Sequence, residues 1–141
     1  GLAAGVSTAV KHLQPGAQVY GVEPSAFDDT ARSMVSGRRE AIDPAARSIC
    51  DALQSPTPGA ITFPINQRTL DGVLTVTDAQ VAEAIRYAYT TLKLVVEPGG
   101  VVGLAALLAG ELDVSGQTVG FGLSGGNVDP ALFSRILAGD L

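Results

Sequence analysis

The chain has 141 residues, which fits a single domain large enough to bury about two-thirds of its unfolded surface. Apolar residues make up 46% and charged residues 16%, so disorder and fibrous structure are not expected; the net charge of −5, with no basic cluster beyond Arg38 and Arg39, argues against nucleic acid and anionic membranes as partners. The one cysteine, Cys50, cannot form an internal disulfide, so we expect a reducing compartment, by default the cytoplasm.

The first quarter of the chain predicts a helix, a strand and a second helix. Apolar residues recur at helical spacing from Leu2 to Leu13, before Pro15 and Gly16 end the pattern. Residues 18–23 are rich in β-forming side chains and predict a buried strand. A helix follows from Ser25 to about Ser36, with Ser25 as its N-cap and Asp28 as the partner in a capping box.

The middle of the chain is less regular. Residues 37–70 carry several prolines and predict a connection with one short helix around residues 45–53. Residues 73–76 predict a strand, after which Thr77 and Gln80 form the capping box of an amphipathic helix. The apolar face of that helix consists of Val81, Ile85, Ala88, Tyr89 and Leu92.

The last third predicts two further helices and one strand. Residues 101–109 are apolar on every side, which is typical of a helix buried between other elements, and Gly110 is its expected stop. This run is far shorter than the roughly 20 residues that cross a bilayer. Residues 118–123 predict a strand and residues 130–137 a helix. Alternation of strands and helices predicts an α/β fold over residues 1–141, three-layered, with a mainly parallel sheet flanked by helices.

Three glycine-containing turns are candidate ligand sites. They are Gly1-Leu2, residues 97–100 and residues 124–127. In open α/β sheets, ligands meet backbone N–H groups and helix N-termini at such turns. Each turn alone is equally compatible with a purely conformational requirement for glycine.

The order of several short phrases carries a resemblance. GLAAG, GVEPSAFDD, TFPIN, VTDAQVAEAIRY, KLVVEPGG and LSGGNVD are together similar to the back portion of serine/threonine dehydratases and serine racemases that depend on pyridoxal 5′-phosphate (PLP). The resemblance implies fold type II, the fold of the tryptophan synthase β chain, and it implies that this chain is the C-terminal part of a PLP-binding large domain. It also implies serine or threonine as the substrate, β-elimination or racemisation as the reaction, and a homo-oligomer.

The same resemblance implies cofactor-binding residues. Gly1 and Leu2 stand at the end of the family's phosphate-binding glycine run, and Ser124, followed by Gly125, stands where a serine hydrogen-bonds the pyridine nitrogen. Glu97 corresponds to a carboxylate near the cofactor. An acid stabilised at a helix N-terminus is an equally good interpretation of Glu97.

A cation site is also implied. Several relatives bind Mg²⁺ or Ca²⁺ in the segment that matches GVEPSAFDD, which places the ligands here at Glu23, the carbonyl of Phe27 and Asp29. Three protein oxygens completed by water suit these hard cations. Asp28 and Asp29 are equally expected at the start of a helix without any metal.

The chain departs from the family pattern at several positions. Ala52 replaces a glycine usual near the cofactor, which makes positive φ or close backbone approach harder there. Cys50 is expected to be a buried small hydrophobe, and His12 to favour the C-terminus of the first helix. PLP enzymes hold the cofactor on a lysine, and neither Lys11 nor Lys93 has the family's context, so we expect no catalysis by this chain alone.

Two alternatives stay open. One is a small phosphate- or nucleotide-binding α/β module, although GLAAG lacks the G-x-G-x-x-G spacing. The other is a non-catalytic fragment that associates with a complementary chain, because the apolar helix at residues 101–109 needs neighbours on all sides.

Overall fold

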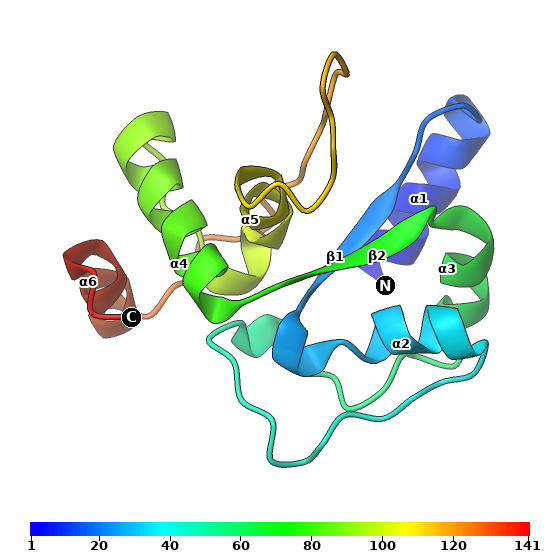
Figure 1. Cartoon of the computed structure of the whole chain (residues 1–141), viewed down its shortest axis with the longest axis horizontal. Coiled ribbons are helices and arrows are strands. Elements are labelled where there is room, and N and C mark those ends of the chain that lie inside the picture. The colour runs from blue at the N-terminus through cyan, green and yellow to red at the C-terminus, as the bar shows by residue number, and fades with distance from the viewer.

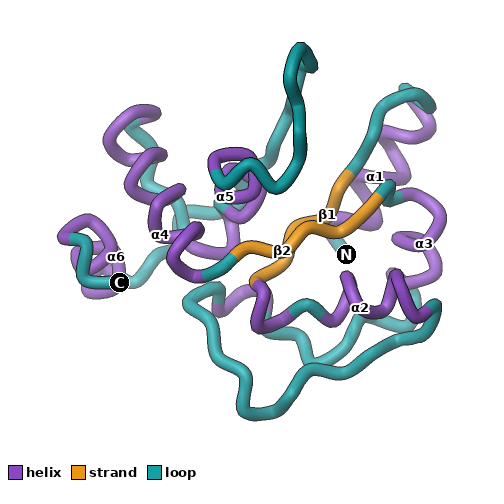
Figure 2. The backbone as a smooth tube through the Cα atoms, viewed as in Figure 1, coloured by secondary structure: helices purple, strands orange, loops and turns teal.

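The fold is built around two parallel strands. The computed structural model describes all residues, from Gly1 to Leu141. Strand β1 (Tyr20–Pro24) pairs with β2 (Gly72–Val76) in parallel register, with Tyr20 beside Gly72 and Pro24 beside Val76. Figures 1 and 2 show the pair crossing the middle of the molecule with helices around it. The predicted α/β class with a parallel sheet flanked by helices is confirmed, with two strands in the sheet.

Helix α1 (Leu2–Leu13) has the predicted bounds, but its large apolar side chains are not its buried face. Leu2 and Leu13 are 68% and 78% exposed, whereas the small residues Ala4 and Ser7 are buried. Ala4 and Ser7 serve the contact with α3 (Thr62–Thr69), where the hydroxyls of Ser7 and Thr69 lie 2.7 Å apart. Small side chains let the two helices approach closely.

Helix α2 (Asp29–Ser36) begins four residues later than predicted. Residues Ser25–Phe27 form a separate 3₁₀ turn, η1, and neither Ser25 nor Asp28 caps a helix through its side chain. The predicted capping box there is therefore wrong, because a carboxylate from the end of β1 takes that role. Glu23 accepts hydrogen bonds from the backbone N–H groups of Thr30 (3.2 Å) and Ala31 (2.9 Å).

The region between α2 and β2 contains a helix that the sequence did not indicate. A proline such as Pro64 ordinarily argues against a helix. Pro64 lies in the first turn of α3, however, where a proline costs no hydrogen bond. The short helix predicted around residues 45–53 is wrong except for a 3₁₀ turn, η2 (Asp51–Leu53). The carboxylate of Asp78 holds this stretch in a bend by accepting from the Ser48 hydroxyl (2.6 Å) and the Ile49 N–H (3.0 Å).

Helix α4 (Asp78–Tyr87) confirms the capping box of Thr77 and Gln80. It continues as a π-helical turn, η3 (Ala88–Leu92), and ends at Lys93, whose φ of 62° is the only positive φ at a non-glycine residue. The predicted apolar face is buried along most of its length. Tyr89, at its edge, is partly exposed and contacts the ring of Phe133 edge-on at 5.5 Å.

The main hydrophobic core lies between α4 and α5 (Val102–Leu108). Helix α5 also contacts both strands, and α6 (Pro130–Ala138) packs on α4. The core side chains are Cys50, Val76, Val81, Ala82, Ala84, Ile85, Ala88, Val96, Val101, Leu104, Ala105, Ala106 and Ile136. Gly110 follows α5 with φ 71°, as predicted for its stop, but Leu108 is 45% exposed, so α5 is not covered on every side. None of the helices has both the length and the apolar character needed to cross a membrane.

The strand predicted at residues 118–123 is wrong. This segment belongs to the long loop between α5 and α6, drawn from yellow to orange in Figure 1. None of its backbone N–H or carbonyl groups bonds to another backbone group. A strand exists only where a second strand pairs with it, and no strand of this chain pairs with residues 118–123.

Candidate functional site

A cavity of about 680 Å³ brings together segments that are far apart in the sequence. Its lining comes from the start of α1, from β1, from residues 52–66, from the 3₁₀ turn η4 (Pro98–Gly100), from the start of α5 and from the loop before α6. Its volume is within the range of small-molecule sites. Gly1, Leu2 and Ser124 all line it.

The other two predicted cofactor residues, Glu97 and Gly125, do not line the cavity, but they contact each other closely. The Glu97 N–H donates to the Gly125 carbonyl at 3.0 Å, and the Ser124 N–H donates to the Gly100 carbonyl at 3.2 Å. The structure therefore brings together two of the three glycine-containing turns as one unit and places the third across the cavity.

The start of α1 suits an anion. Gly1 is the N-cap residue, and no side chain caps the helix, so the N–H groups of the first turn have no partner within α1. A Cβ atom added at Gly1 would meet nothing within 4 Å, which leaves open space around that backbone. Free N–H groups at a helix N-terminus facing a cavity are the arrangement that binds phosphate in many proteins.

Ala52 is accommodated at the position where a glycine was expected. The φ of Ala52 is not positive. A Cβ atom added at Gly99 would lie 3.3 Å from the Ala52 Cβ, so the glycine at residue 99 leaves the room that Ala52 occupies. Cys50 is fully buried, and burial raises the pKa of its thiol to about 11, which confirms a packing role.

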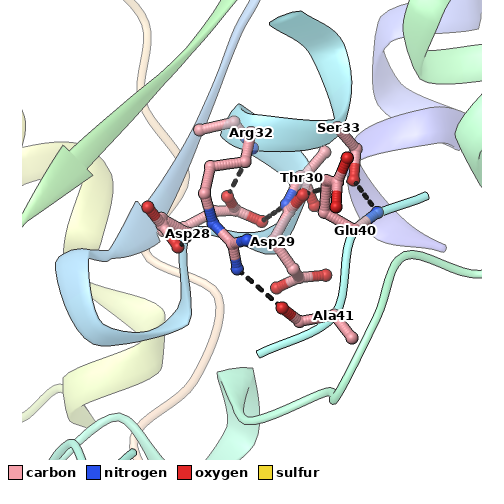
Figure 3. Close-up of polar contacts among 9 residues, drawn as sticks. Asp28, Asp29, Thr30, Arg32, Ser33, Glu40 and Ala41 are labelled. Atoms are coloured by element: carbon pink, nitrogen blue, oxygen red, sulfur yellow. Dashed lines mark hydrogen bonds and ion pairs between the residues drawn. The ribbon is translucent and has the colours of Figure 1, made fainter. Parts of the chain in front are cut away.

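The residues predicted to bind a cation come from three successive elements, with Glu23 in β1, Phe27 in the 3₁₀ turn η1 and Asp29 at the start of α2. Glu23 and Asp29 both line the cavity, and Phe27 is buried beside them. Burial raises the pKa of Glu23, which its hydrogen bonds with Thr30 and Ala31 partly oppose, and burial also raises the pKa of Asp29. Figure 3 shows the polar contacts of this region, where Arg32 bonds to Asp28 and not to Asp29. The structure contains no cluster of three or more His, Cys, Asp or Glu side chains suited to a metal.

Both lysines lie away from the cavity. Lys11 forms an ion pair with Asp71 at 2.7 Å and donates to the Ala17 carbonyl at 2.8 Å. Lys93 donates to the carbonyl of Thr90 at 2.6 Å. His12 lies in the last turn of α1, as predicted. Neither lysine side chain of this chain therefore lines the cavity.

Two side chains of interest gave no clear signal in the sequence. Asp78 fixes the bend that carries Ala52 to the cavity wall, and its only sequence signal is its position in the first turn of a capped helix. Asn66, in α3, lines the cavity, and its side-chain oxygen is buried without a hydrogen-bond partner. An isolated asparagine in an irregular stretch gives no pattern from which this could be predicted.

Comparison with known proteins places the chain in a family. A family model described as pyridoxal-phosphate dependent enzyme matches residues 1–125. The chain is 40% identical over 139 residues to L-threo-3-hydroxyaspartate ammonia-lyase from Pseudomonas sp, covering 99% of this chain and 43% of that protein. It is 37% identical over 142 residues to serine racemase from Dictyostelium discoideum, covering 97% and 43% respectively.

The structural comparison agrees. The crystal structure of threonine deaminase from T.th. matches with a TM-score of 0.84 and 43% identity, covering 91% of this chain and 43% of the other. The chain thus spans about two fifths of the length of the relatives it matches. The family match extends over most of the chain, and the identity to ammonia-lyases and racemases extends over nearly all of it. The chain belongs to the family of pyridoxal-phosphate dependent enzymes, in its fold type II branch.

Proposed function

We propose that this chain is the C-terminal part of the PLP-binding domain of a serine/threonine dehydratase or a serine racemase. The complete enzyme would remove the α-proton of serine or threonine and then either expel the β-hydroxyl, giving a 2-oxo acid and ammonia, or return the proton to the other face. The names of the relatives, ammonia-lyase and racemase, support this pair of outcomes.

One observation carries the proposal. Gly1 and Leu2, proposed to hold the phosphate, and Ser124, proposed to face the ring nitrogen, line the same cavity although they lie far apart in the sequence. Nothing in their sequence neighbourhoods requires them to meet. Their meeting is what a single elongated ligand, with a phosphate at one end and a ring nitrogen at the other, would need.

The chemistry of the lining fits the cofactor. The N–H groups at the start of α1 would hold the phosphate, and the Ser124 hydroxyl would meet the ring nitrogen. A neutral hydroxyl leaves that nitrogen largely unprotonated, which suits β-elimination. When bound, PLP withdraws electrons from the α-carbon of the amino acid and so acidifies its proton. The residues of this chain orient the cofactor and exclude water from one side of it.

We also propose that this chain alone performs neither reaction. A PLP enzyme needs a lysine at the cofactor, and both lysines here are bonded elsewhere, Lys11 to Asp71 and Lys93 to Thr90. In the complete enzyme the lysine would come from another part of the polypeptide. The whole α-proton transfer would then depend on groups that meet this cavity from the opposite side.

A phosphate ester without an aldehyde tests the binding half of the proposal. 4′-Deoxypyridoxine 5′-phosphate retains the phosphate and the ring nitrogen but cannot react with an amine. We expect it to shift the amide resonances of Leu2, Ala3 and Ser124, which line the cavity, in the ¹⁵N-labelled chain, and we expect pyridoxine without phosphate to shift Leu2 and Ala3 much less. Shifts confined to other parts of the surface would overturn the assignment of the cavity.

A second experiment tests the catalytic half. PLP and L-serine are added to the chain, and 2-oxo acid release and borohydride-stable labelling of lysine are measured. We expect no 2-oxo acid and no selective labelling. Turnover that disappears in Lys11→Ala or Lys93→Ala would show that one of these lysines serves the cofactor and would overturn the proposal.

We propose an optional Mg²⁺ or Ca²⁺ site at Glu23, the Phe27 carbonyl and Asp29. It is supported by two neighbouring carboxyls, those of the partly buried Glu23 and the buried Asp29, whose pKa values are both raised by burial, since a cation would relieve that cost. Both Glu23 oxygens already accept N–H bonds, but each retains a lone pair. We expect Ca²⁺ to raise the melting temperature of the chain and Asp29→Asn to abolish the rise, whereas an equal rise in Asp29→Asn would refute the site.

One observation supports association of this chain with another copy or with a complementary chain. The backbone of residues 118–123 has no backbone partner, and Val119 and Phe121 within it are about two-fifths exposed. Such a segment favours pairing with another polypeptide. We expect sedimentation velocity to show species larger than a monomer at micromolar concentration, and a well-behaved monomer over that range would count against association.

A further inference from the structure

The carboxylate of Glu97 is turned toward the loop that carries Ser124. Its Oε2 atom accepts a hydrogen bond from the backbone N–H of Asn127 at 2.9 Å. The backbone N–H of Glu97 donates to the Gly125 carbonyl at 3.0 Å, and the Glu97 carbonyl accepts from the Gly100 N–H at 3.0 Å. Glu97 thus bonds both to its own turn and, at two points, to the loop after Ser124.

The contact with Gly125 is close enough to require a glycine. A Cβ atom added at Gly125 would overlap the Glu97 carboxylate. A Cβ added at Gly100 would lie 2.8 Å from the Gly125 nitrogen, so the two turns also meet backbone to backbone. The Glu97 carboxylate therefore lies against the α-carbon of Gly125. Its side chain occupies space that is open because residues 100 and 125 are both glycine.

Glu97 does not share the surface that a ligand would touch. The cavity wall in this region consists of Gly99, Gly100, Gly122 and Ser124. Ser124 joins this wall through its own N–H bond to the Gly100 carbonyl at 3.2 Å. Residues 118–123, which precede Ser124, have no backbone partners of their own. The only backbone hydrogen bond of Ser124 is the one to Gly100, which belongs to the unit that Glu97 holds together, and on the other side the Leu123 side chain packs against the core.

We propose that Glu97 is a positioning residue that holds the loop at residues 124–127 against the turn at residues 97–100, and thereby fixes Ser124 at the cavity wall without contacting the ligand itself. The proposal rests on the proposed function only in that Ser124 is the residue whose place matters. It replaces direct cofactor binding by Glu97 with an indirect role. It also predicts that substitutions at Glu97 and Gly125 have coupled effects on stability, because the Glu97 carboxylate occupies the space that a Cβ atom at residue 125 would need.

Side-chain variants of Glu97 test the hydrogen bond. Glu97→Gln keeps an oxygen acceptor of the same reach, Glu97→Asp is one methylene shorter, and Glu97→Ala removes the acceptor. We expect amide exchange at Asn127 and Ser124 to accelerate on the order of tenfold in Glu97→Ala and Glu97→Asp, as for loss of one charge-assisted bond, and to stay near the wild-type rate in Glu97→Gln. Glu111→Ala, which removes an exposed carboxylate bonded to Gln80, is the matched control and leaves both amides unchanged.

The coupled pair gives an independent test. We expect Gly125→Ala to lower the urea midpoint strongly in the wild type and only weakly in the Glu97→Ala background, where the overlapping carboxylate is gone. Gly126→Ala is the control, because its Cβ would meet only the Val95 carbonyl, at 3.0 Å, and its cost should be the same in both backgrounds. Equal costs for Gly125→Ala in the two backgrounds, with unchanged exchange at Asn127 in Glu97→Ala, would overturn the proposal.

These measurements need no cofactor, so their failure and that of the proposed function are distinguishable. Binding of 4′-deoxypyridoxine 5′-phosphate with no effect of Glu97→Ala on Ser124 would count against the role of Glu97 alone. Confirmed coupling of Glu97 with Gly125, without any binding of the analogue, would support the positioning role and count against the cofactor site.

Discussion

Glu23 links the end of β1 to the start of α2, and its replacement should destabilise the chain more than its place near a strand end suggests. Its two carboxylate oxygens accept from the N–H groups of Thr30 at 3.2 Å and Ala31 at 2.9 Å. Glu23→Ala leaves both donors without this acceptor in a partly buried place. Burial of the carboxyl outweighs these two bonds in setting its pKa, so the bonds contribute less than bonds to an exposed carboxylate would. Loss of a helix N-cap acceptor costs about 0.5–2 kcal/mol, and we expect a net loss of roughly 1–2 kcal/mol.

The assay is urea unfolding at pH 7 followed by circular dichroism, with the free energy extrapolated to water and the slope m compared between variants. The matched control is Ser25→Ala, which removes the residue that the sequence pattern indicates as the N-cap. Ser25 makes no capping bond, so its loss should change stability by less than about 0.5 kcal/mol. A cost for Ser25→Ala as large as that for Glu23→Ala, or a cost below about 0.5 kcal/mol for Glu23→Ala, would refute the assignment of the cap.

Three further outcomes are expected. The raised pKa of Glu23 lets the folded chain keep a proton that the unfolded chain has lost, so the contribution of Glu23 to folding stability is complete below about pH 4.5 and declines as the pH rises through the raised value. The stability difference between wild type and Glu23→Gln should therefore shrink over that window. A difference independent of pH would contradict the raised pKa. Amides of residues 118–123 should exchange within seconds while that of Ile85 in α4 is strongly protected, and comparable protection would show that the segment is paired. Cys50 should resist Ellman's reagent at pH 8 in the native chain and react fully in denaturant, whereas rapid native labelling would show an accessible thiol.

Where the sequence predicted structure well, the determinants were local. The capping box of Thr77 and Gln80 lies within four residues, and both of its hydrogen bonds form as expected. Helix α1 begins beside a glycine and ends before Pro15, and its bounds match the prediction to the residue. Helix α3 was missed although its determinants are also local, because a proline such as Pro64 indicates a break everywhere except in the first turn of a helix, where this one falls.

Where the sequence failed, the missing partner was remote. The acids and hydroxyls around residue 25 favour a capping box, yet the carboxylate that caps α2 comes from β1, where no helical pattern points to it. Residues 118–123 have the composition of a strand but no strand to pair with. Local propensity describes what a segment can form, and pairing decides whether it does.

The candidate site shows the same contrast between local and remote determinants. It also adds a distinction between residues that line the cavity and residues that hold others in place. The phrases that carried the resemblance predicted Gly1, Leu2 and Ser124 as neighbours of one ligand, and the structure places all three on one cavity. Those phrases do not distinguish residues that would face the ligand from residues that would hold others in place. Glu97 and Gly125 do not line the cavity, and the Glu97 carboxylate accepts from the Asn127 N–H, which is why we propose a positioning role for Glu97.

That distinction bears on how the site would respond to change. Ser124 sits between residues 118–123, which have no backbone partners, and a turn in which side chain, backbone and two glycines interlock. The Leu123 side chain packs on the core, but the backbone of Ser124 is bonded only to this turn, and a serine must be held within a few tenths of an ångström to keep a hydrogen bond to a ring nitrogen. The rigidity of the unit at residues 97–100 and 124–127 is therefore a requirement of the proposed chemistry. Substitutions at Glu97 should weaken the response of Ser124 to the cofactor analogue even though no atom of Glu97 lines the cavity.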